Sequence, residues 1–255
     1  MAPRPVSLLA LLALLALSLA CHGDRRRDAS EIEAPPPPAL EEYMGRRIAR
    51  TMHSSGAEWL LRETREEEER PSRLFDALAV RPGWTVADFG CGNGFHTLEL
   101  ARRVGPAGRV LAVDIQPEML VMLRQRAAAA GIANVETIEA LSHDPRLPPA
   151  ACDLILLVDV YHELGHPEET LAALRRALRP GGRVVLVEFR AEDPAVPIKE
   201  LHKMSKVQIR AELAANGFEL AEEFDDLPWQ HVMFFRAAPA LRAGAERARD
   251  QALKR

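Results

Sequence analysis

The sequence predicts an α/β fold in which helices cover both faces of a mostly parallel sheet. Short apolar runs alternate with stretches of helical periodicity from residue 85 onward. One of these runs, Leu154–Val158, is continuously apolar, as in a central strand that is covered on both faces. A glycine-rich loop over residues 90–94 connects the first run to a helical stretch. With 255 residues, the chain allows one large domain or two small ones.

The first predicted strand, Thr85–Phe89, carries Asp88 next to its last residue, and the glycine-rich loop follows directly. Glycines lack a Cβ, so the backbone of this loop can pass close to a ligand and adopt positive φ angles. The amides at the start of the next helix, Phe95–Val104, are free to donate hydrogen bonds. In an open α/β sheet, the crevice beside such a loop holds a nucleotide-like ligand.

The loop departs from the dinucleotide fingerprint G-x-G-x-x-G, because Phe95 stands at the third glycine position. The observed pattern is acid-x-Gly-x-Gly-x-Gly. It resembles motif I of the class I S-adenosylmethionine-dependent methyltransferases, which implies a Rossmann-like, doubly wound, seven-stranded sheet. In that family the acid, here Asp88, faces the amino group of the cofactor, and the loop wraps its methionine part. The corresponding loop residues are Gly90, Cys91, Gly92, Asn93 and Gly94. S-adenosylmethionine carries a sulfonium and an ammonium instead of a diphosphate, which agrees with a loop that lacks Lys and Arg.

Asp114 ends the second predicted strand, Val110–Val113, and lies 26 residues after Asp88. That separation is close to the length of one strand–helix–strand unit, and an acid at this position can accept hydrogen bonds from ribose hydroxyls. We therefore assign Asp114 and the adjoining Ile115 to cofactor binding. Pro117 opens the helix that follows.

The third predicted strand, Val135–Ile138, leads into the loop Glu139–Asp144. In the methyltransferases that this sequence resembles, the adenine edge of the cofactor usually meets this loop. The resemblance points to His143 or Asp144 as the contact to the exocyclic amine, although the Gly-Asp-Ala pattern of the family is absent here.

Polar residues directly follow the central strand, at the end where a ligand binds in such sheets. In the family this segment, motif IV, lines the methyl-transfer site. We assign Asp159 to the cofactor, and Tyr161 and His162 to catalysis, together with His202 from a later loop. A structural interpretation stays open, in which Glu163 caps the next helix and His162 packs on the loop. No metal site is expected.

The Leu-Arg-Pro-Gly-Gly-x-Val-Val sequence over residues 178–185 resembles a late motif of the same family, so the resemblance covers Val86–Arg190. Two final strands are expected to complete the sheet, the last of them inserted antiparallel. The domain is expected to span residues 40–238. The remaining elements are helix Leu171–Leu178, strand Val184–Phe189, helix Val207–Asn216, strands Phe218–Glu223 and His231–Arg236, and a polar tail over residues 239–255.

Residues 40–82 are expected to form an N-terminal helical cap, and the spacing of apolar residues predicts a helix over Leu40–Met52. In the family such a prelude often caps the cofactor. Tyr43 and Trp59 are therefore candidates for a lid, with ordinary packing against the sheet as the alternative. The charged run Arg65–Arg70 indicates a solvated helix face without a function.

Residues 1–21 resemble a secretory or lipoprotein signal. Arg4 precedes the apolar run Val6–Ala20, and small residues lead up to Cys21. The run is shorter than the ~20 residues that a spanning helix needs. Residues 22–39, with four consecutive prolines, form an extended tether. We expect an exported protein attached to the cell envelope, and the alternative is an uncleaved anchor that holds the domain in the cytoplasm.

A nucleic-acid partner is not expected, because the net charge is −4 and no basic face interleaved with aromatic residues is present. The resemblance implies methyl transfer from S-adenosylmethionine to a small-molecule acceptor, as in the ubiquinone/menaquinone and arsenite types. The arsenite type needs several thiolates, but beyond Cys21 the chain has only Cys91 and Cys152. These two are expected at opposite edges of the sheet, too far apart for a disulfide. A nicotinamide-dependent oxidoreductase and a non-catalytic envelope protein that keeps the fold remain alternatives.

Overall fold

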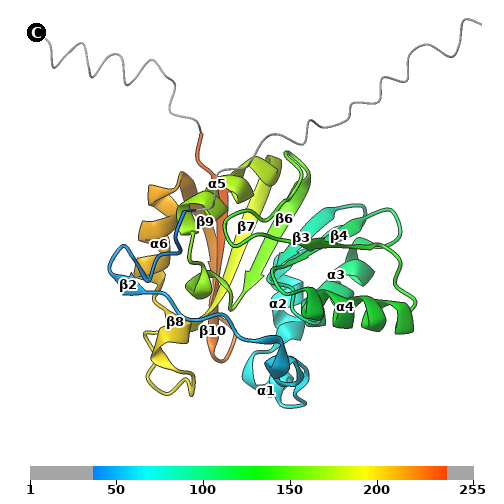
Figure 1. Cartoon of the computed structure of the whole chain (residues 1–255), viewed down its shortest axis with the longest axis horizontal. Coiled ribbons are helices and arrows are strands. Elements are labelled where there is room, and N and C mark those ends of the chain that lie inside the picture. The colour runs from blue at the N-terminus through cyan, green and yellow to red at the C-terminus, as the bar shows by residue number, and fades with distance from the viewer. Residues whose placement is uncertain (1–36, 240–255) are drawn as a thin grey trace, which may run out of the picture. The chain divides into compact units, whose positions relative to one another are not determined.

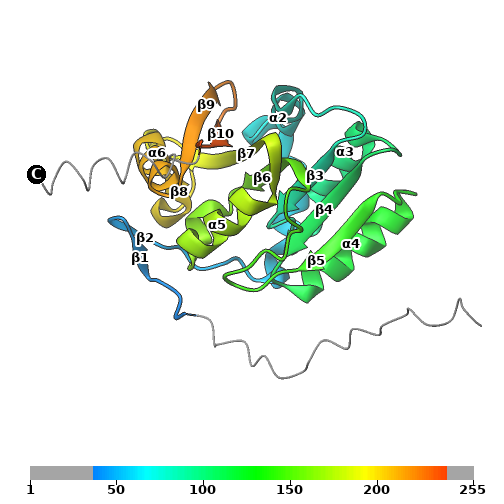
Figure 2. The ribbon, with the colours of Figure 1, turned by 90° about the horizontal axis from the view of Figure 1, so that it is seen from above.

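The computed structural model describes residues 37–239, and these contain one large sheet with helices on both faces (Figures 1 and 2). The strand order is β5-β4-β3-β6-β7-β10-β9, and the two-residue strand β8 pairs beside the end of β7. Strand β10 runs antiparallel between β7 and β9. The strands from β5 to β7 in this order all run parallel to one another. The predicted fold class is confirmed. The strands are β3 (Thr85–Phe89), β4 (Arg109–Asp114), β5 (Val135–Glu139), β6 (Cys152–Val158), β7 (Leu178–Arg190), β8 (Lys203–Met204), β9 (Phe218–Phe224) and β10 (Gln230–Ala237).

The signal, most of the tether and nearly all of the polar tail lie outside the described residues. Between residues 37 and 239, no helix is both long and apolar enough to cross a membrane.

Alternate residues of each strand pack into two separate cores, because successive side chains point to opposite faces of a sheet. On one face, residues such as Val86 and Leu156 contact helices α2 (Pro71–Leu78) and α3 (Phe95–Val104). Helix α4 (Pro117–Ala129) packs on Ala112. On the other face, residues including Ile155 and Leu157 meet the two remaining large helices. These are α5 (Pro167–Ala177) and α6 (Lys206–Ala215).

The parallel strands β3 to β7 bring the segments that follow them to the same edge of the sheet. Strand β3 pairs with β4 on one side and with β6 on the other, so the direction of winding reverses at β3. Such a switch point leaves a crevice outside the carboxyl ends of the strands. The glycine-rich loop after β3 and the polar segment after β6 therefore face each other across this crevice.

The helix expected over residues 40–52 is wrong, because this segment forms a β-hairpin. Strands β1 (Glu42–Tyr43) and β2 (Arg46–Arg47) pair antiparallel. Met44 and Gly45 between them have φ angles of 47° and 89°, as a two-residue hairpin turn requires. A 3₁₀ helix, η1 (Ser54–Leu61), and the short helix α1 (Arg65–Glu68) follow, so the cap is helical only in its later part.

Arg46 fixes the hairpin to helix α6 through a buried ion pair. Its Nε and Nη2 atoms donate to the two carboxylate oxygens of Glu212, at 2.7 and 3.1 Å. Glu212 is fully buried and also accepts from the Tyr161 hydroxyl at 2.7 Å. The hairpin is thereby held against the segment that follows β6.

We expect Arg46→Met to lower the free energy of unfolding by about 3 kcal/mol, because the loss of one partner leaves a buried charge uncompensated. Urea unfolding of the full chain measures this change. Arg47→Met is the matched control, since Arg47 is exposed on the same hairpin and should change stability by less than about 0.5 kcal/mol. Equal losses in both variants would contradict the assignment.

Candidate active site

A cavity of about 960 Å³ opens at the carboxyl edge of the sheet. Its volume lies at the upper end of the range found for small-molecule sites. The wall combines the glycine-rich loop, the end of β4, the segment after β6 and the loop before β8 with part of the N-terminal segment. Residues on these elements include Gly90, Gly92, Asp114, Ile115, Asp159, His162, Glu163 and His202.

The glycine-rich loop packs so closely against neighbouring side chains that a Cβ would not fit at Gly90 or Gly92. Gly90 has a φ of 72°, and a Cβ there would lie 2.4 Å from Val160. The Asp114 carboxylate accepts from the amides of Gly92 and Gln116, each at 2.9 Å. Burial raises the pKa of Asp114. Each carboxylate oxygen can accept a further hydrogen bond, so Asp114 is available to ligand hydroxyls.

Asp159 lines the cavity with a carboxylate that is only half satisfied. Oδ2 accepts from Gln230 Nε2 at 2.7 Å, whereas Oδ1 is buried and has no hydrogen-bond partner among residues 37–239. The backbone is left-handed, with a φ of 54°. Burial, followed by the charges of Glu69 and Glu188, raises the pKa of Asp159 well above its usual value. An unpartnered buried acceptor of this kind favours a ligand that carries a cation or a donor.

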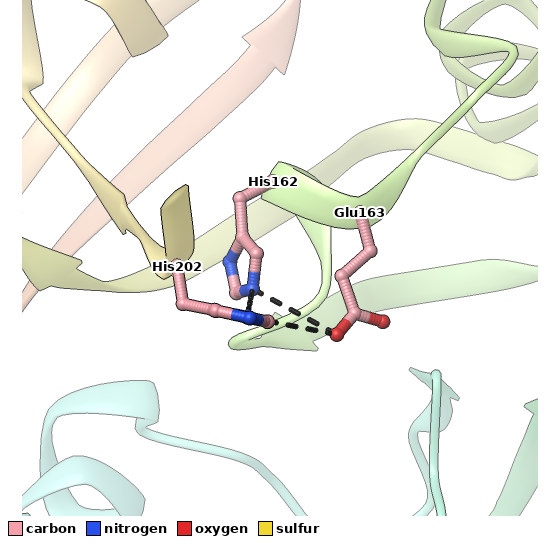
Figure 3. Close-up of side chains that lie close together, drawn as sticks. All are labelled: His162, Glu163 and His202. Atoms are coloured by element: carbon pink, nitrogen blue, oxygen red, sulfur yellow. Dashed lines mark hydrogen bonds and ion pairs between the residues drawn. The ribbon is translucent and has the colours of Figure 1, made fainter. Parts of the chain in front are cut away.

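Two histidines and a glutamate meet beyond Asp159, where Figure 3 shows them pointing toward one another. His162 Nδ1 lies 2.6 Å from Glu188 Oε2, and His162 Nε2 lies 3.0 Å from His202 Nδ1. Burial would lower the pKa of His162, but Glu188 outweighs it and the net shift is upward. Burial and the nearby His162 lower the pKa of His202. Burial also raises the pKa of Glu163 to about 7.

The structure places Tyr161 away from the cavity, which corrects its assignment to catalysis. The side chain is fully buried, and its hydroxyl donates to Glu212 on the opposite side of the segment. One residue further on, His162 faces the cavity, because successive residues of this short 3₁₀ helix, η2 (Tyr161–Glu163), point in different directions. Tyr161 is therefore a packing residue that holds the hairpin.

Six predicted cofactor contacts lie outside the residues that line the cavity. Asn93 donates to the Ala57 carbonyl at 2.8 Å, so it supports the loop from the rear. Asp144 accepts from the Arg146 amide, and Leu141 and Ser142 line the cavity in its place. The other four residues outside the lining are Asp88, Cys91, Gly94 and His143.

The N-terminal segment forms part of the cavity wall, but only one of the two candidate lid residues lies there. Trp59 lines the cavity, whereas Tyr43 is buried and accepts from Asn216 Nδ2 at 2.8 Å. The expectation of a solvated charged face is wrong for Arg65 and Glu69, which are 4% and 2% exposed. They form an ion pair of 2.7 Å, and Arg65 contributes to the cavity wall.

Gln116 and Glu188 are site residues that the sequence prediction missed. The Gln116 side chain joins the N-terminal segment to the Asp114 turn, donating to the Met52 carbonyl and accepting from the Ser54 amide at 2.9 and 2.7 Å. Glu188 could have been identified from the sequence, because it is the one acid in the apolar run Val184–Phe189. A charge in a central strand is rarely retained without a specific partner.

Residues 86–182 match the family model of a methyltransferase domain. A ubiquinone/menaquinone biosynthesis C-methyltransferase of Ralstonia pickettii (strain 12J) is 35% identical over 111 residues, 44% of this chain and 45% of that protein. An uncharacterized 37.1 kDa protein in a transposon of Streptomyces fradiae is 37% identical over 117 residues, 46% of this chain and 33% of that protein. The chain thus spans about half, or less, of the length of the curated relatives it matches.

Solved structures of methyltransferases share the fold. A SAM-dependent methyltransferase from Aquifex aeolicus aligns with a TM-score of 0.69 and 23% identity, covering 74% of this chain and 100% of the other. The 4+2 cyclase SpnF aligns with a TM-score of 0.56 and 17% identity, covering 65% and 81%. Because one of these proteins is named a cyclase, the fold alone does not fix the reaction.

The buried carboxyl of Asp88 is expected to make the stability of the fold depend on pH. It lies beneath the loop and accepts from Thr97 Oγ1 at 2.5 Å. Burial, with a smaller contribution from Asp114, raises the pKa of Asp88 from 3.8 to about 6, and Thr97 and Arg65 act in the opposite direction. A folded-state pKa above the unfolded one means that the carboxyl stabilises the fold at low pH, and that this contribution is lost as the pH rises from about 4 to 6.

We therefore expect Asp88→Asn to raise the free energy of unfolding by about 2–3 kcal/mol at about pH 8, and to change it little at about pH 4. Urea unfolding at the two pH values measures the difference. A variant that is stabilised or destabilised equally at both would contradict this origin of the pKa shift.

Proposed function

We propose that this protein is a methyltransferase that uses S-adenosylmethionine and acts on a small-molecule acceptor. One observation carries the proposal: a single cavity joins the glycine-rich loop and the strand-end acid Asp114 to the polar groups that follow β6. Since β3 alone separates β4 from β6, Asp114 and the polar groups after β6 lie on strand ends about 10 Å apart. The methyltransferase-domain match over residues 86–182 supports the same conclusion.

The residues of the cavity fit this cofactor. Gly90 and Gly92 provide a cradle that side chains would fill. Asp114 is placed to accept from ribose hydroxyls, and the unpartnered oxygen of Asp159 suits an ammonium group. The loop carries no cation of the kind that binds a diphosphate. When bound, S-adenosylmethionine supplies a methyl group activated by a positively charged sulfur.

The chain's own contribution to the reaction is to position two reactants and to exclude water. The loop after β3 and Asp114 hold one reactant, and the N-terminal segment covers it through the Gln116 contacts. His162, Glu163 and His202 form the acceptor side. Their nitrogen and oxygen atoms are the groups available to orient an acceptor and to deal with its proton.

The acceptor is proposed to be a small molecule. The cavity is enclosed by short segments, and the curated methyltransferases that match this chain are named for ubiquinone and menaquinone biosynthesis. The formal net charge of −4 favours a small molecule over a nucleic acid.

Calorimetric titration of the full chain with S-adenosylhomocysteine and, separately, with NAD tests the proposal. We expect binding of S-adenosylhomocysteine and none of NAD. Asp114→Ala should weaken binding by about 1–3 kcal/mol, the usual cost of losing hydrogen bonds to a charged acceptor. Asp159→Asn should also weaken binding, because asparagine cannot ionise beside a bound ammonium, although it tolerates the left-handed backbone.

Asp153→Asn is the matched control, because Asp153 lies on β6, the strand that Asp159 directly follows, but contacts Thr85 and Arg179 outside the cavity. Its affinity should equal that of the wild type. Preference for NAD would support an oxidoreductase, binding of neither ligand would support a non-catalytic protein, and either result would overturn the proposal.

We further propose that residues 1–20 direct export and that the segment from Cys21 to residue 39 then attaches the protein to the cell envelope. The support is the apolar run that ends at Cys21 and the proline-rich stretch after it. A reporter fused after Pro38 should be active only outside the cytoplasm, and the mass of the mature protein should show cleavage before Cys21. A silent reporter with Met1 retained would instead support a membrane-tethered cytoplasmic enzyme.

A further inference from the structure

His162, Glu163 and His202 bring three metal-ligating atoms together at the cavity wall (Figure 3). His162 Nε2 and His202 Nδ1 are 3.0 Å apart, and each lies 3.9 Å from Glu163 Oε1. In the plane of these three atoms, the point equidistant from them lies about 2.1 Å from each. That distance matches the 2.0–2.2 Å found for zinc bound to imidazole nitrogen and carboxylate oxygen.

The separations also distinguish this cluster from a network of hydrogen bonds. A distance of 3.9 Å from Glu163 to each histidine is too long for a hydrogen bond. Only the two imidazoles are within hydrogen-bond distance of each other. The same oxygen of Glu163 accepts from the Met52 amide at 3.3 Å, and this contact holds the carboxylate toward both nitrogens, as ligands that share a cation are arranged.

A histidine that binds a metal through one ring nitrogen usually donates from the other to a carboxylate or carbonyl, and Glu188 is that acceptor for His162. Its Oε2 lies 2.6 Å from His162 Nδ1, so the Nδ1 proton is held there and the Nε2 lone pair faces the cluster. Glu188 is fully buried and accepts from the Tyr161 amide through its other oxygen, which fixes its orientation. The carboxylates of Glu163 and Glu188 together balance the charge of a divalent ion.

We propose that His162, Glu163 and His202 bind a divalent transition-metal ion, with Glu188 as the residue that positions His162. Two imidazoles and one carboxylate are a ligand set suited to zinc or ferrous iron, and three protein ligands leave coordination positions open. The ligand side chains are 2%, 12% and 30% exposed, so the most accessible one, His202, marks the open side.

The open positions adjoin the cavity, where an oxygen or nitrogen atom of the acceptor can bind the ion. A bound ion lowers the pKa of such a group. This role for the ion rests on the proposed function, whereas metal binding itself does not. The acceptor class that fits is therefore a small molecule with a coordinating hydroxyl or amine.

Zinc binding by the full chain, purified without a histidine tag and freed of metal with a chelator, tests the proposal. We expect one zinc ion per chain by competition with a chromophoric chelator. His202→Ala and Glu163→Gln remove one ligand each and should weaken binding by more than about a hundredfold, whereas Glu188→Gln should weaken it about 10–100-fold. Substitution by Co²⁺ should give an absorption spectrum that differs between the wild type and His202→Ala.

His53→Ala is the matched control, because His53 is an exposed histidine outside the cavity and its loss should leave zinc affinity unchanged. Circular dichroism shows whether each variant is folded, and His202 is exposed enough for its alanine variant to fold. Equal zinc affinities of the wild type and His202→Ala would overturn the proposal.

Titration of the same samples with S-adenosylhomocysteine separates the two proposals. Retained S-adenosylhomocysteine binding without zinc binding would overturn the metal site alone. Zinc binding that is lost in His202→Ala would support the metal site even if S-adenosylhomocysteine fails to bind.

Discussion

The pairing of β3 with β4 on one side and β6 on the other determines the whole site. Parallel register aligns Phe89 with Val113 and with Leu157, so all three strands end at the same level. The glycine-rich loop must then turn within the narrow space between two neighbours. A Cβ at Gly90 would lie 2.4 Å from Val160, which follows β6, and the Gly90 amide donates to the Val113 carbonyl of β4 at 2.8 Å. A residue with a side chain at this position would push the strands apart or move the loop out of the cavity.

Buried carboxylates surround this edge of the sheet, and their partners separate structural roles from functional ones. Glu212 is matched by Arg46 and serves to hold the hairpin. Glu188 is matched by His162 and by a backbone amide. Asp159 keeps one oxygen without a partner in the described part of the chain. An unpaired buried acceptor lowers the stability of the fold. A ligand that donates a hydrogen bond to this oxygen therefore accounts best for its presence.

Local patterns predicted the parts of this structure that depend on local chemistry. The spacing of Asp88 and the glycines, the acid at residue 114 and the apolar strands all led to the right fold. The hairpin was missed because its stability comes from a distant partner, Glu212, which no pattern near residue 46 reveals.

The side-chain roles at the site depended on details finer than sequence patterns. Within the motif after β6, one residue decides whether a side chain faces the cavity or the core, which is why Tyr161 and His162 differ. His162 and His202 were both predicted for the site, but the contact between these residues, which lie 40 positions apart, depends on the pairing of β8 with β7.

The central claim is that one cavity holds the cofactor between Asp114 and Asp159. A crystal structure of the full chain with S-adenosylhomocysteine tests it most directly. The account predicts ribose hydroxyls within hydrogen-bond distance of Asp114 and the ligand's ammonium at the unpartnered oxygen of Asp159. A ligand bound elsewhere, or bound in the cavity without contact to either carboxylate, would contradict it.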